Sequence, residues 1–332
     1  EAGIGKTRLT QAFSDRALQQ GFDVHRVLVL DFGAAQGQDA VRSLLRSLIG
    51  LDADDSEQSC QDIIREALQS GLVLEKDLPH LHNILGLPQE GNSRTLYDAM
   101  DAERRKVGHR DVIRHCLITQ SKRTPLFVIV EDVHWADPSA LDTVADLVRS
   151  VENSQVILVA TTRIESDPLG QLNTAGLGAT ELITLDLKTL RAEESMQLAA
   201  AFDDPSKDLV RLCIERSKGN PLFLEQLLRN AATSKLNAVP DTIQSLVQAS
   251  LDKLSDNDRN ALEAAAVMGQ RFQLEHVRKM ISDPHFDPAG LISNRLVQLD
   301  GQDFLFAHAL VRDGVYSSIL GSRLRNLHVG MA

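Results

Sequence analysis

The chain has 332 residues, more than the roughly 250 to 300 at which a single hydrophobic core stops growing, so two or three domains are predicted. Its 43% hydrophobic and 24% charged residues are typical of a globular protein and exclude a disordered chain. The formal charge of 35 − 46 = −11 excludes a general basic field for binding DNA or an anionic membrane surface.

The sequence predicts a cytoplasmic protein. It contains no uninterrupted apolar stretch of membrane-spanning length and no pattern of a signal peptide. The three cysteines, Cys60, Cys116 and Cys213, form no CxxC pair, which fits reduced thiols in a reducing compartment. Because the chain starts at Glu1 and stops within an amphipathic helical pattern, we expect it to be a piece of a longer protein.

Short apolar runs predict four buried strands in the first 190 residues, separated by helical stretches. Their Val-, Ile- and Leu-rich composition does not alternate with polar residues, which is typical of parallel strands covered on both faces. The first region is therefore predicted to be α/β. The expected strands are residues 24–31, 126–132, 155–162 and 181–187.

From Lys188 onward the pattern becomes helical. Helices are predicted over 192–201, 207–217 and 221–232, and then from Asp241 to Leu254 and over 259–268. Ser255 and Asp258 resemble a capping box at the start of the last of these, and Gly269 is a stop signal for it. Two further helices, 274–281 and 288–295, precede a hairpin pattern around Asp300-Gly301. Three helices followed by a hairpin suggest a winged-helix module.

A glycine-rich loop opens the chain. Gly3-Ile4-Gly5-Lys6-Thr7 matches the last part of the pattern G-x-x-x-x-G-K-[ST], whose first glycine would lie one residue before Glu1. In such a loop the backbone N–H groups surround a polyphosphate, the lysine reaches the β- and γ-phosphates, and the threonine hydroxyl binds Mg²⁺. The following helix points its positive N-terminal dipole at the same phosphates. A plain glycine turn before a helix is the alternative.

Two further strand ends carry polar groups that suit Mg²⁺ and phosphate. The run Leu126–Val130 ends in Glu131-Asp132, which is the arrangement of the Walker B motif, and 156–160 is followed by Thr161-Thr162-Arg163. One carboxylate would orient Mg²⁺ and the other would act as general base toward water, and we favour Glu131 for the metal and Asp132 for the base. Arg163 is a candidate γ-phosphate sensor. A solvated acidic turn and a solvated arginine are the alternatives.

These segments together resemble a known family. The strings E-A-G-I-G-K-T, F-V-I-V-E-D-V-H-W-A-D-P-S-A-L, V-A-T-T-R, G-N-P-L-F-L-E and F-A-H-A-L-V-R-D-G-V-Y resemble the STAND branch of AAA-related P-loop ATPases. The module is found in bacterial multidomain regulators, beside class III adenylate or guanylate cyclases, LuxR-type transcription factors or Ser/Thr kinases. The resemblance spans nearly the whole chain, and E-D-V-H-W-A-D-P is its most specific string.

The resemblance implies roles for individual residues. ATP or ADP would be held by Gly3, Ile4, Gly5, Lys6, Thr7 and Arg8, with Thr7 and Glu131 as Mg²⁺ ligands and Asp132, Glu131 and Arg163 as catalytic groups. Gly219-Asn220-Pro221 resembles the lid motif whose proline packs near the adenine, although Asn220 also fits a helix cap with Pro221 in the first turn. His308 resembles a winged-helix histidine that reaches the phosphates, and a buried structural histidine is the alternative. His134 and Trp135 would contact the nucleotide or pack.

The implied fold is a P-loop NTPase core with a parallel sheet of strand order 5-1-4-3-2, its first strand missing from this chain. The core would span 1–190, an all-α lid 191–237 and a winged-helix-like domain 238–332. Lys6 and Asp132 are 132 − 6 = 126 positions apart, more than a simple βαβ crossover needs, so a helical insertion is expected over about 35–122.

The predicted function is an ATP-binding, slowly hydrolysing switch that controls an output domain in the same chain, such as a cyclase, a helix-turn-helix or a kinase, and self-associates on binding ATP. Cyclase activity would lie outside these residues. The alternative is a nucleotide-stabilised module that binds protein or DNA without turnover. The acidic charge argues against DNA, since residues 271–280 carry only Arg271, Arg278 and Lys279 against Glu275. No metal site is expected at His80 and His82, which we place in a solvated loop.

Overall fold

The computed structural model describes residues 2–29, 38–52, 55–89, 91–136, 138–163, 182–202, 207–233, 243–300 and 303–331. The chain forms two compact units: one comprises Thr7–Thr184, and the other comprises Glu1–Lys6 together with Leu185–Ala332. No helix among the described residues is long and apolar enough to cross a membrane. The division into three domains at residues 190 and 237 remains a prediction.

A parallel sheet is the centre of the Thr7–Thr184 unit. Its strands are β1 (Asp23–Leu28), β2 (Leu126–Glu131) and β3 (Val156–Ala160), in the spatial order β1-β2-β3. In the register, Leu28 lies opposite Glu131, and Val130 lies opposite Ala160. All six residues of β2 are buried, as its unbroken apolar run predicts for a central parallel strand.

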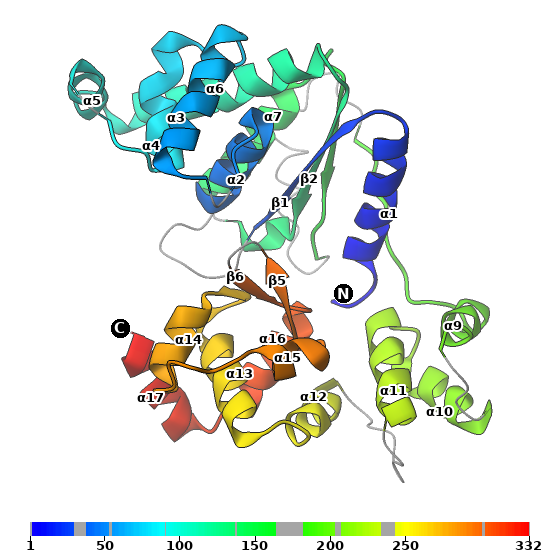
Figure 1. The fold of residues 1–332 in the computed structure, drawn as a ribbon. Helices are drawn as coiled ribbons and strands as arrows, with labels where there is room; N and C mark the ends of the chain where they lie inside the picture. The colour runs from blue at the N-terminus through cyan, green and yellow to red at the C-terminus, as the bar shows by residue number, and fades with distance from the viewer. Residues whose placement is uncertain are drawn as a thin grey trace. The chain divides into compact units, whose positions relative to one another are not determined.

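Helices cover both faces of this sheet (Figure 1). Leu126, Val128 and Val130 face the main core, which also includes residues of α2 (Gln38–Ile49), α6 (Ala102–Ser121) and α7 (Pro138–Ser150). The alternate residues of β2, Phe127 and Ile129, pack with Ala17 of α1 (Lys6–Gln19) on the other face. Alternation along the strand therefore assigns each side chain of β2 to one of two layers.

Five α-helices stand between β1 and β2 in the described residues: α2, α3 (Glu57–Gln69), α4 (Leu78–Leu85), α5 (Asn92–Asp98) and α6. A short 3-10 helix, η1 (Glu75–Asp77), precedes α4. Side-chain caps start α3 at Ser56 and α6 at Asp101, as expected for these residue types at helix N-termini. The expectation of a solvated loop at His80 is wrong, because His80 lies on α4 with only 7% of its surface exposed, beside the rings of Tyr97 and His109.

The other unit begins, after its N-terminal loop, with irregular backbone over 185–190 and then α9 (Ala192–Ala199), α10 (Lys207–Ser217) and α11 (Pro221–Thr233). These helices agree with the predicted ones. A core of Cys213, Phe223, Leu224, Leu227 and Leu228 joins α10 to α11. The leucine spacing on α11 is thus the buried face of an amphipathic helix.

The C-terminal part of this unit has its own core and a small antiparallel sheet. It contains the strands β4 (Arg271–Phe272), β5 (Val297–Asp300) and β6 (Asp303–Phe306), and the helices α12 (Ile243–Leu251), α13 (Asp256–Met268), α14 (Leu274–Met280), α15 (Ala289–Ser293), α16 (Ala309–Ser318) and α17 (Gly321–Met331). The strand order is β4-β6-β5. The capping side chain of Ser255 and the end of α13 at Gly269 agree with the prediction. Asp241 and Gly301 lie outside the described residues, and the winged-helix assignment remains a prediction.

One predicted strand is wrong. Residues 182–187 of the expected strand 181–187 form no ladder, and residue 181 lies outside the described residues. Leu182, Ile183 and Leu185 are 48%, 71% and 65% exposed. A strand exists only when a neighbour accepts and donates its backbone hydrogen bonds, and within the described residues β3 pairs with β2 alone. The complete strand order 5-1-4-3-2 remains a prediction.

Candidate functional site

Residues Ala2–Lys6 form a glycine loop that leads into α1. Gly3 and Gly5 have φ of +77° and +102°, a region that side chains with a Cβ rarely adopt. A Cβ on Gly5 would meet nothing within 4 Å, so its backbone conformation is what requires glycine there. Ile4 is buried at 8% exposure, which anchors the loop between its two glycines. Lys6 opens α1, and Thr7 and Arg8 are exposed in the first turn.

The glycine loop is attached to the start of α11. The side-chain amide of Asn220 donates from Nδ2 to the carbonyl oxygen of Ala2 at 3.0 Å, and the backbone N–H of Leu222 donates to the carbonyl oxygen of Gly3 at 3.3 Å. A Cβ on Gly3 would lie 2.9 Å from Oδ1 of Asn220, so this close approach also requires glycine. Asn220 and Leu222 therefore fix the backbone of the loop.

Asn220 has two functions at once. Its Oδ1 accepts from the backbone N–H of Phe223 at 3.1 Å, which is the predicted helix cap, while its Nδ2 holds the loop. Pro221 follows as the first residue of α11. Gly219 has φ +77°, and a Cβ there would lie 2.4 Å from the carbonyl oxygen of Leu190. Each residue of this motif thus has a local structural role, and a contact of Pro221 with adenine remains a prediction.

Glu131 is placed by α1 in the Thr7–Thr184 unit. Alternation along β2 turns Glu131 toward the face that α1 covers, where its Oε1 accepts a hydrogen bond from Oγ1 of Thr10 at 2.8 Å. The guanidinium of Arg26, on β1, lies 3.7 Å from the same oxygen and also donates to Ser14. Glu131 is only 7% exposed, and these partners offset the cost of burying its polar carboxyl group.

Asp132 occupies a tight turn after β2. It has φ +57° and ψ +43°, the left-handed region that is uncommon for residues other than glycine. The turn is fixed by Thr161, the first residue after β3: its Oγ1 accepts from the N–H of Asp132 at 3.0 Å and its carbonyl from the N–H of Val133 at 2.9 Å. The carboxylate of Asp132 is 33% exposed, so it faces solvent more than that of Glu131 does.

Arg163 lies against the short 3-10 helix η2 (Val133–Trp135) that follows Asp132. Its guanidinium carbon is 5.3 Å from the centre of the Trp135 ring, a cation–π distance. The side chain of His134 is 3% exposed, 4.8 Å from the ring of Trp135, and its Nδ1 is 3.8 Å from Oδ1 of Asp132. Trp135 also packs on the main core. These rings therefore pack, and they support the turn that carries Asp132.

His308 caps α16. Its Nδ1 accepts from the backbone N–H of Leu310 at 3.1 Å, so a neutral ring carries its proton on Nε2. Nearby in sequence, Arg312 is 6% exposed and donates to the carbonyl of Ala266, which ties α16 to α13. Helix capping and packing thus explain part of the sequence pattern around His308. Contact of His308 with phosphate remains a prediction.

Four positioning residues carry roles that the sequence did not reveal. Thr10 and Arg26 act on Glu131, Thr161 acts on Asp132, and the Nδ2 of Asn220 acts on the loop. For Arg26 and Asn220 the partner lies 131 − 26 = 105 and 218 positions away, which no local pattern indicates. Thr161 did carry a local signal, since it directly follows a buried strand.

Comparison with known proteins finds a family similarity in the first part of the chain. Residues 1–159 match the family model of the AAA ATPase domain, a family that in general binds nucleotide with Mg²⁺. An uncharacterised protein of Rhizobium meliloti (strain 1021) is 28% identical over 256 residues, which are 68% of this chain and 23% of the relative. The chain thus spans about a quarter of that relative's length.

One solved structure shares the fold at a TM-score above 0.5. A Signal Transduction ATPase with Numerous Domains (STAND) from Pyrococcus horikoshii, which has a tetratricopeptide repeat sensor, aligns with 99% of this chain and 41% of its own at 16% identity, with a TM-score of 0.58. The Walker-type ATPase of Pyrococcus abyssi aligns with 94% of this chain and 88% of its own at 13% identity, with a TM-score of 0.43. The glycine loop, the buried strand ending in two carboxylates and the matched family model agree: the first part of this chain is similar to the AAA ATPase domain, and the chain shares its fold with a STAND ATPase.

Proposed function

We propose that this chain is an ATP-binding, slowly hydrolysing regulatory switch within a larger signalling protein. The observation that supports this most directly is the hydrogen bond from Thr10 to Glu131. It joins the end of the central strand to the helix that begins at Lys6, so the acidic pair and the glycine loop are carried by directly connected elements.

The glycine loop would bind the phosphates of the nucleotide. Backbone N–H groups of residues 3–7 would donate to phosphate oxygens, and the positive end of the α1 dipole favours the same anion. Lys6 would place its ammonium on the β- and γ-phosphates. Ile4 would keep the loop anchored, and Arg8 would add a positive charge beside it.

Thr7 and Glu131 fit the requirements of Mg²⁺. One offers a hydroxyl and the other a carboxylate, the hard oxygen donors that this ion prefers. The ion, when bound, would neutralise charge on the phosphates. Thr10 and Arg26 hold the carboxylate of Glu131 in a fixed orientation, which suits a metal ligand better than a group that must move a proton.

Asp132 would act as general base toward the attacking water. Its carboxylate is more exposed than that of Glu131, and its backbone is held in a strained turn by Thr161. Arg163, one residue past Thr162 at the end of the next strand, would stabilise negative charge on the γ-phosphate. To reach the γ-phosphate, the guanidinium of Arg163 would leave its cation–π contact with the Trp135 ring.

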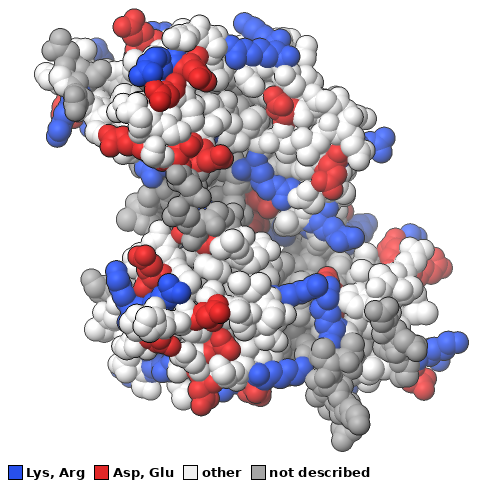
Figure 2. Space-filling view, viewed as in Figure 1, with Lys and Arg blue, Asp and Glu red and all other residues white. Residues whose placement is uncertain are grey.

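The regulatory part of the proposal concerns the lid and the C-terminal part. Asn220 connects the lid helix α11 to the glycine loop, so a nucleotide in the loop would bias the position of the lid. Pro221 would pack near adenine and His308 would donate from Nε2 to a phosphate. The output would be a cyclase, helix-turn-helix or kinase domain of the same chain, and ATP binding would favour self-association. On the face drawn in Figure 2, acidic and basic side chains are interspersed, which offers DNA no broad basic surface.

Steady-state hydrolysis of Mg-ATP by the full protein tests the assignment. We expect Asp132→Asn to bind Mg-ATP normally and to lower kcat by about 10²-fold or more, the range for loss of a general base. Glu131→Gln should raise the Mg²⁺ concentration needed for half-maximal activity. Asp98→Asn, an exposed residue of α5, is the control and should behave as wild type.

Two results would contradict the proposal. Wild-type turnover in Asp132→Asn together with inactive Glu131→Gln would reverse the two roles. Tight ATP binding by the unaltered protein with no turnover above background would favour the alternative, a nucleotide-stabilised binding module.

A further inference from the structure

The carboxylate of Glu131 is anchored to the protein through one of its two oxygens. Thr10 donates a hydrogen bond to Oε1 at 2.8 Å, and the guanidinium of Arg26 lies 3.7 Å from the same oxygen. Within the described part of the chain, Oε2 of Glu131 accepts no hydrogen bond. The protein therefore fixes the orientation of Glu131 through Oε1 and leaves Oε2 as the oxygen that can bind a metal ion.

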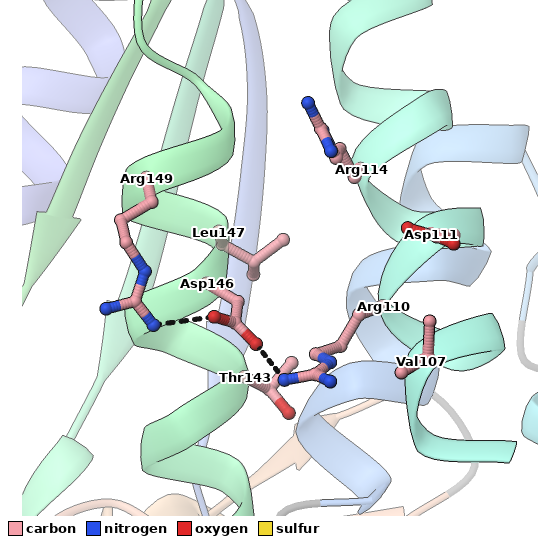
Figure 3. Close-up of a pocket in the computed structure, with 8 residues that line it drawn as sticks. All are labelled: Val107, Arg110, Asp111, Arg114, Thr143, Asp146, Leu147 and Arg149. Atoms are coloured by element: carbon pink, nitrogen blue, oxygen red, sulfur yellow. Dashed lines mark hydrogen bonds and ion pairs between the residues drawn. The ribbon is translucent and has the colours of Figure 1, made fainter. Parts of the chain in front are cut away.

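A second carboxylate of the same unit shows the contrasting arrangement. Asp146 of α7 accepts a hydrogen bond on Oδ1 from Arg149 at 2.6 Å, and it accepts another on Oδ2 from Arg110 of α6 (Figure 3). Guanidinium groups thus bind both oxygens of Asp146 directly. This carboxylate links two helices, and unlike Glu131 it has no oxygen without a hydrogen bond.

Arg26 supplies charge to Glu131 without a hydrogen bond to it. The 3.7 Å between its Nη1 and Oε1 of Glu131 is an ion-pair distance but is too long for a hydrogen bond. Its Nη2 instead donates to Oγ of Ser14 at 3.3 Å, and Ser14 donates to the backbone carbonyl of Thr10. Helix α1 therefore holds the guanidinium beside Glu131, where its permanent positive charge acts on the carboxylate.

We propose that Arg26 makes the binding of Mg²⁺ at Glu131 depend on nucleotide. This inference rests on the proposed function, in which Glu131 is a Mg²⁺ ligand. Without nucleotide, the charge of Arg26 offsets that of Glu131 and repels a cation that approaches Oε2. The phosphates of ATP bring negative charge to the site, which outweighs this repulsion. The protein then has little affinity for free Mg²⁺, and the ion binds together with the nucleotide. Arg26 acts through Glu131 and is a positioning residue.

The proposal predicts opposite effects for the two groups next to Oε1. Arg26→Gln removes the positive charge, so Mg²⁺ should bind about tenfold more tightly. Thr10→Val removes only the hydrogen bond that orients the carboxylate, so Mg²⁺ should bind more weakly. Arg26→Lys keeps the charge and should resemble the wild type. Ser14→Ala releases the guanidinium from α1 and should tighten Mg²⁺ binding by a smaller factor than Arg26→Gln does.

Binding of a fluorescent ATP analogue, titrated with Mg²⁺ at a fixed concentration of the analogue, measures these effects without turnover. The Mg²⁺ concentration for half-maximal binding should fall in Arg26→Gln and rise in Thr10→Val and in Glu131→Gln. Arg149→Gln is the matched control, because it also removes an arginine that is paired with a carboxylate of the same unit. It should leave the Mg²⁺ concentration for half-maximal binding unchanged.

A second measurement uses Mn²⁺, which prefers the same oxygen ligands and is detected by electron paramagnetic resonance. Without nucleotide, Arg26→Gln should bind one Mn²⁺ more tightly than the wild type does, and adding Glu131→Gln to that variant should abolish the gain. This result would place the effect of Arg26 on Glu131 itself.

The outcomes separate this inference from the proposed function. If Glu131→Gln weakens Mg²⁺ binding while Arg26→Gln and Ser14→Ala leave it unchanged or weaken it, the inference is overturned and the metal role of Glu131 stands. A purely structural role for Arg26 gives this result, because Arg26→Gln then changes binding in the same direction as Thr10→Val. If Glu131→Gln leaves Mg²⁺ binding unchanged, the metal role of Glu131 fails and the inference fails with it.

Discussion

Asn220 is predicted to couple the lid helix to nucleotide binding through the backbone of the glycine loop. Two hydrogen bonds meet on its side chain: Oδ1 accepts from Phe223 and Nδ2 donates to Ala2. Asn220→Asp keeps an oxygen for the cap but replaces the donor with a carboxylate oxygen facing a carbonyl oxygen. Asn220→Ala removes both bonds.

The expected magnitudes follow from these contacts. Loss of a helix cap costs about 1 kcal/mol, within a range of about 0.5 to 2. Leaving the partly buried carbonyl of Ala2 without its donor costs up to about 1 to 3 kcal/mol. Asn220→Ala should therefore destabilise the unit by about 2 to 4 kcal/mol. Asn220→Asp should weaken ATP binding by up to about tenfold, because a typical net hydrogen bond of about 0.5 to 1.5 kcal/mol no longer orders the loop.

Equilibrium titration with a fluorescent ATP analogue, combined with thermal unfolding followed by circular dichroism, measures both effects. Ser255→Ala is the matched control, because it removes a helix cap of the same unit that does not contact the glycine loop. It should lower stability by about 1 kcal/mol and leave ATP affinity unchanged. If Asn220→Asp bound the analogue as tightly as the wild type while remaining folded, the coupling through Ala2 would be refuted.

Thr161→Val should leave ATP affinity intact and lower kcat about tenfold, because the N–H of Asp132 loses its acceptor. Recovery of kcat in Thr161→Ser would confirm the role of the hydroxyl. An unchanged kcat in Thr161→Val would contradict it. A second prediction concerns acid: burial, with the positive fields of His80 and Arg105, lowers the pKa of His109 from 6.5 to about 4. Between these two pKa values the unfolded chain binds more protons than the folded chain does. The contribution of His109 to the free energy of unfolding is therefore fully present above about pH 6.5 and is lost as the pH falls toward about 4. Because the ring is partly exposed, we expect a loss on the order of 2 kcal/mol, and urea titrations of His109→Gln should show a shallower decline than the wild type; parallel curves would contradict the assignment.

The regular elements could be predicted because their determinants are local. The apolar run of β2 and the leucine spacing of α11 each appear within one short segment, and both elements form where expected. The strand expected over 181–187 rested on an apolar pattern interrupted by Thr184 and Asp186, and a strand also requires a partner with open hydrogen-bonding groups. That condition belongs to the assembled sheet and leaves no trace in the run itself.

The candidate site likewise contains residues that the sequence indicates and residues that it does not. Glu131, Asp132 and Arg163 could be selected because strand ends are visible in the sequence and parallel strands end at one edge. The residues that hold these side chains in place could not be selected from the sequence. Thr10 reaches Glu131 because one turn of α1 passes over the end of β2, and this depends on packing between segments 131 − 10 = 121 positions apart. The surroundings of His134 and Trp135 were likewise undetermined until their packing was seen.

Binding of Mg-ATP by the unaltered protein and by Lys6→Ala tests the central claim most directly. Lys6 is the mobile cation of the proposed phosphate site, and its removal leaves the backbone of the loop in place. Lys122→Ala, an exposed lysine at the end of α6, is the control. The account predicts tight binding by the wild type and by Lys122→Ala, and loss of tight binding in Lys6→Ala. Equal affinity in all three proteins would contradict it.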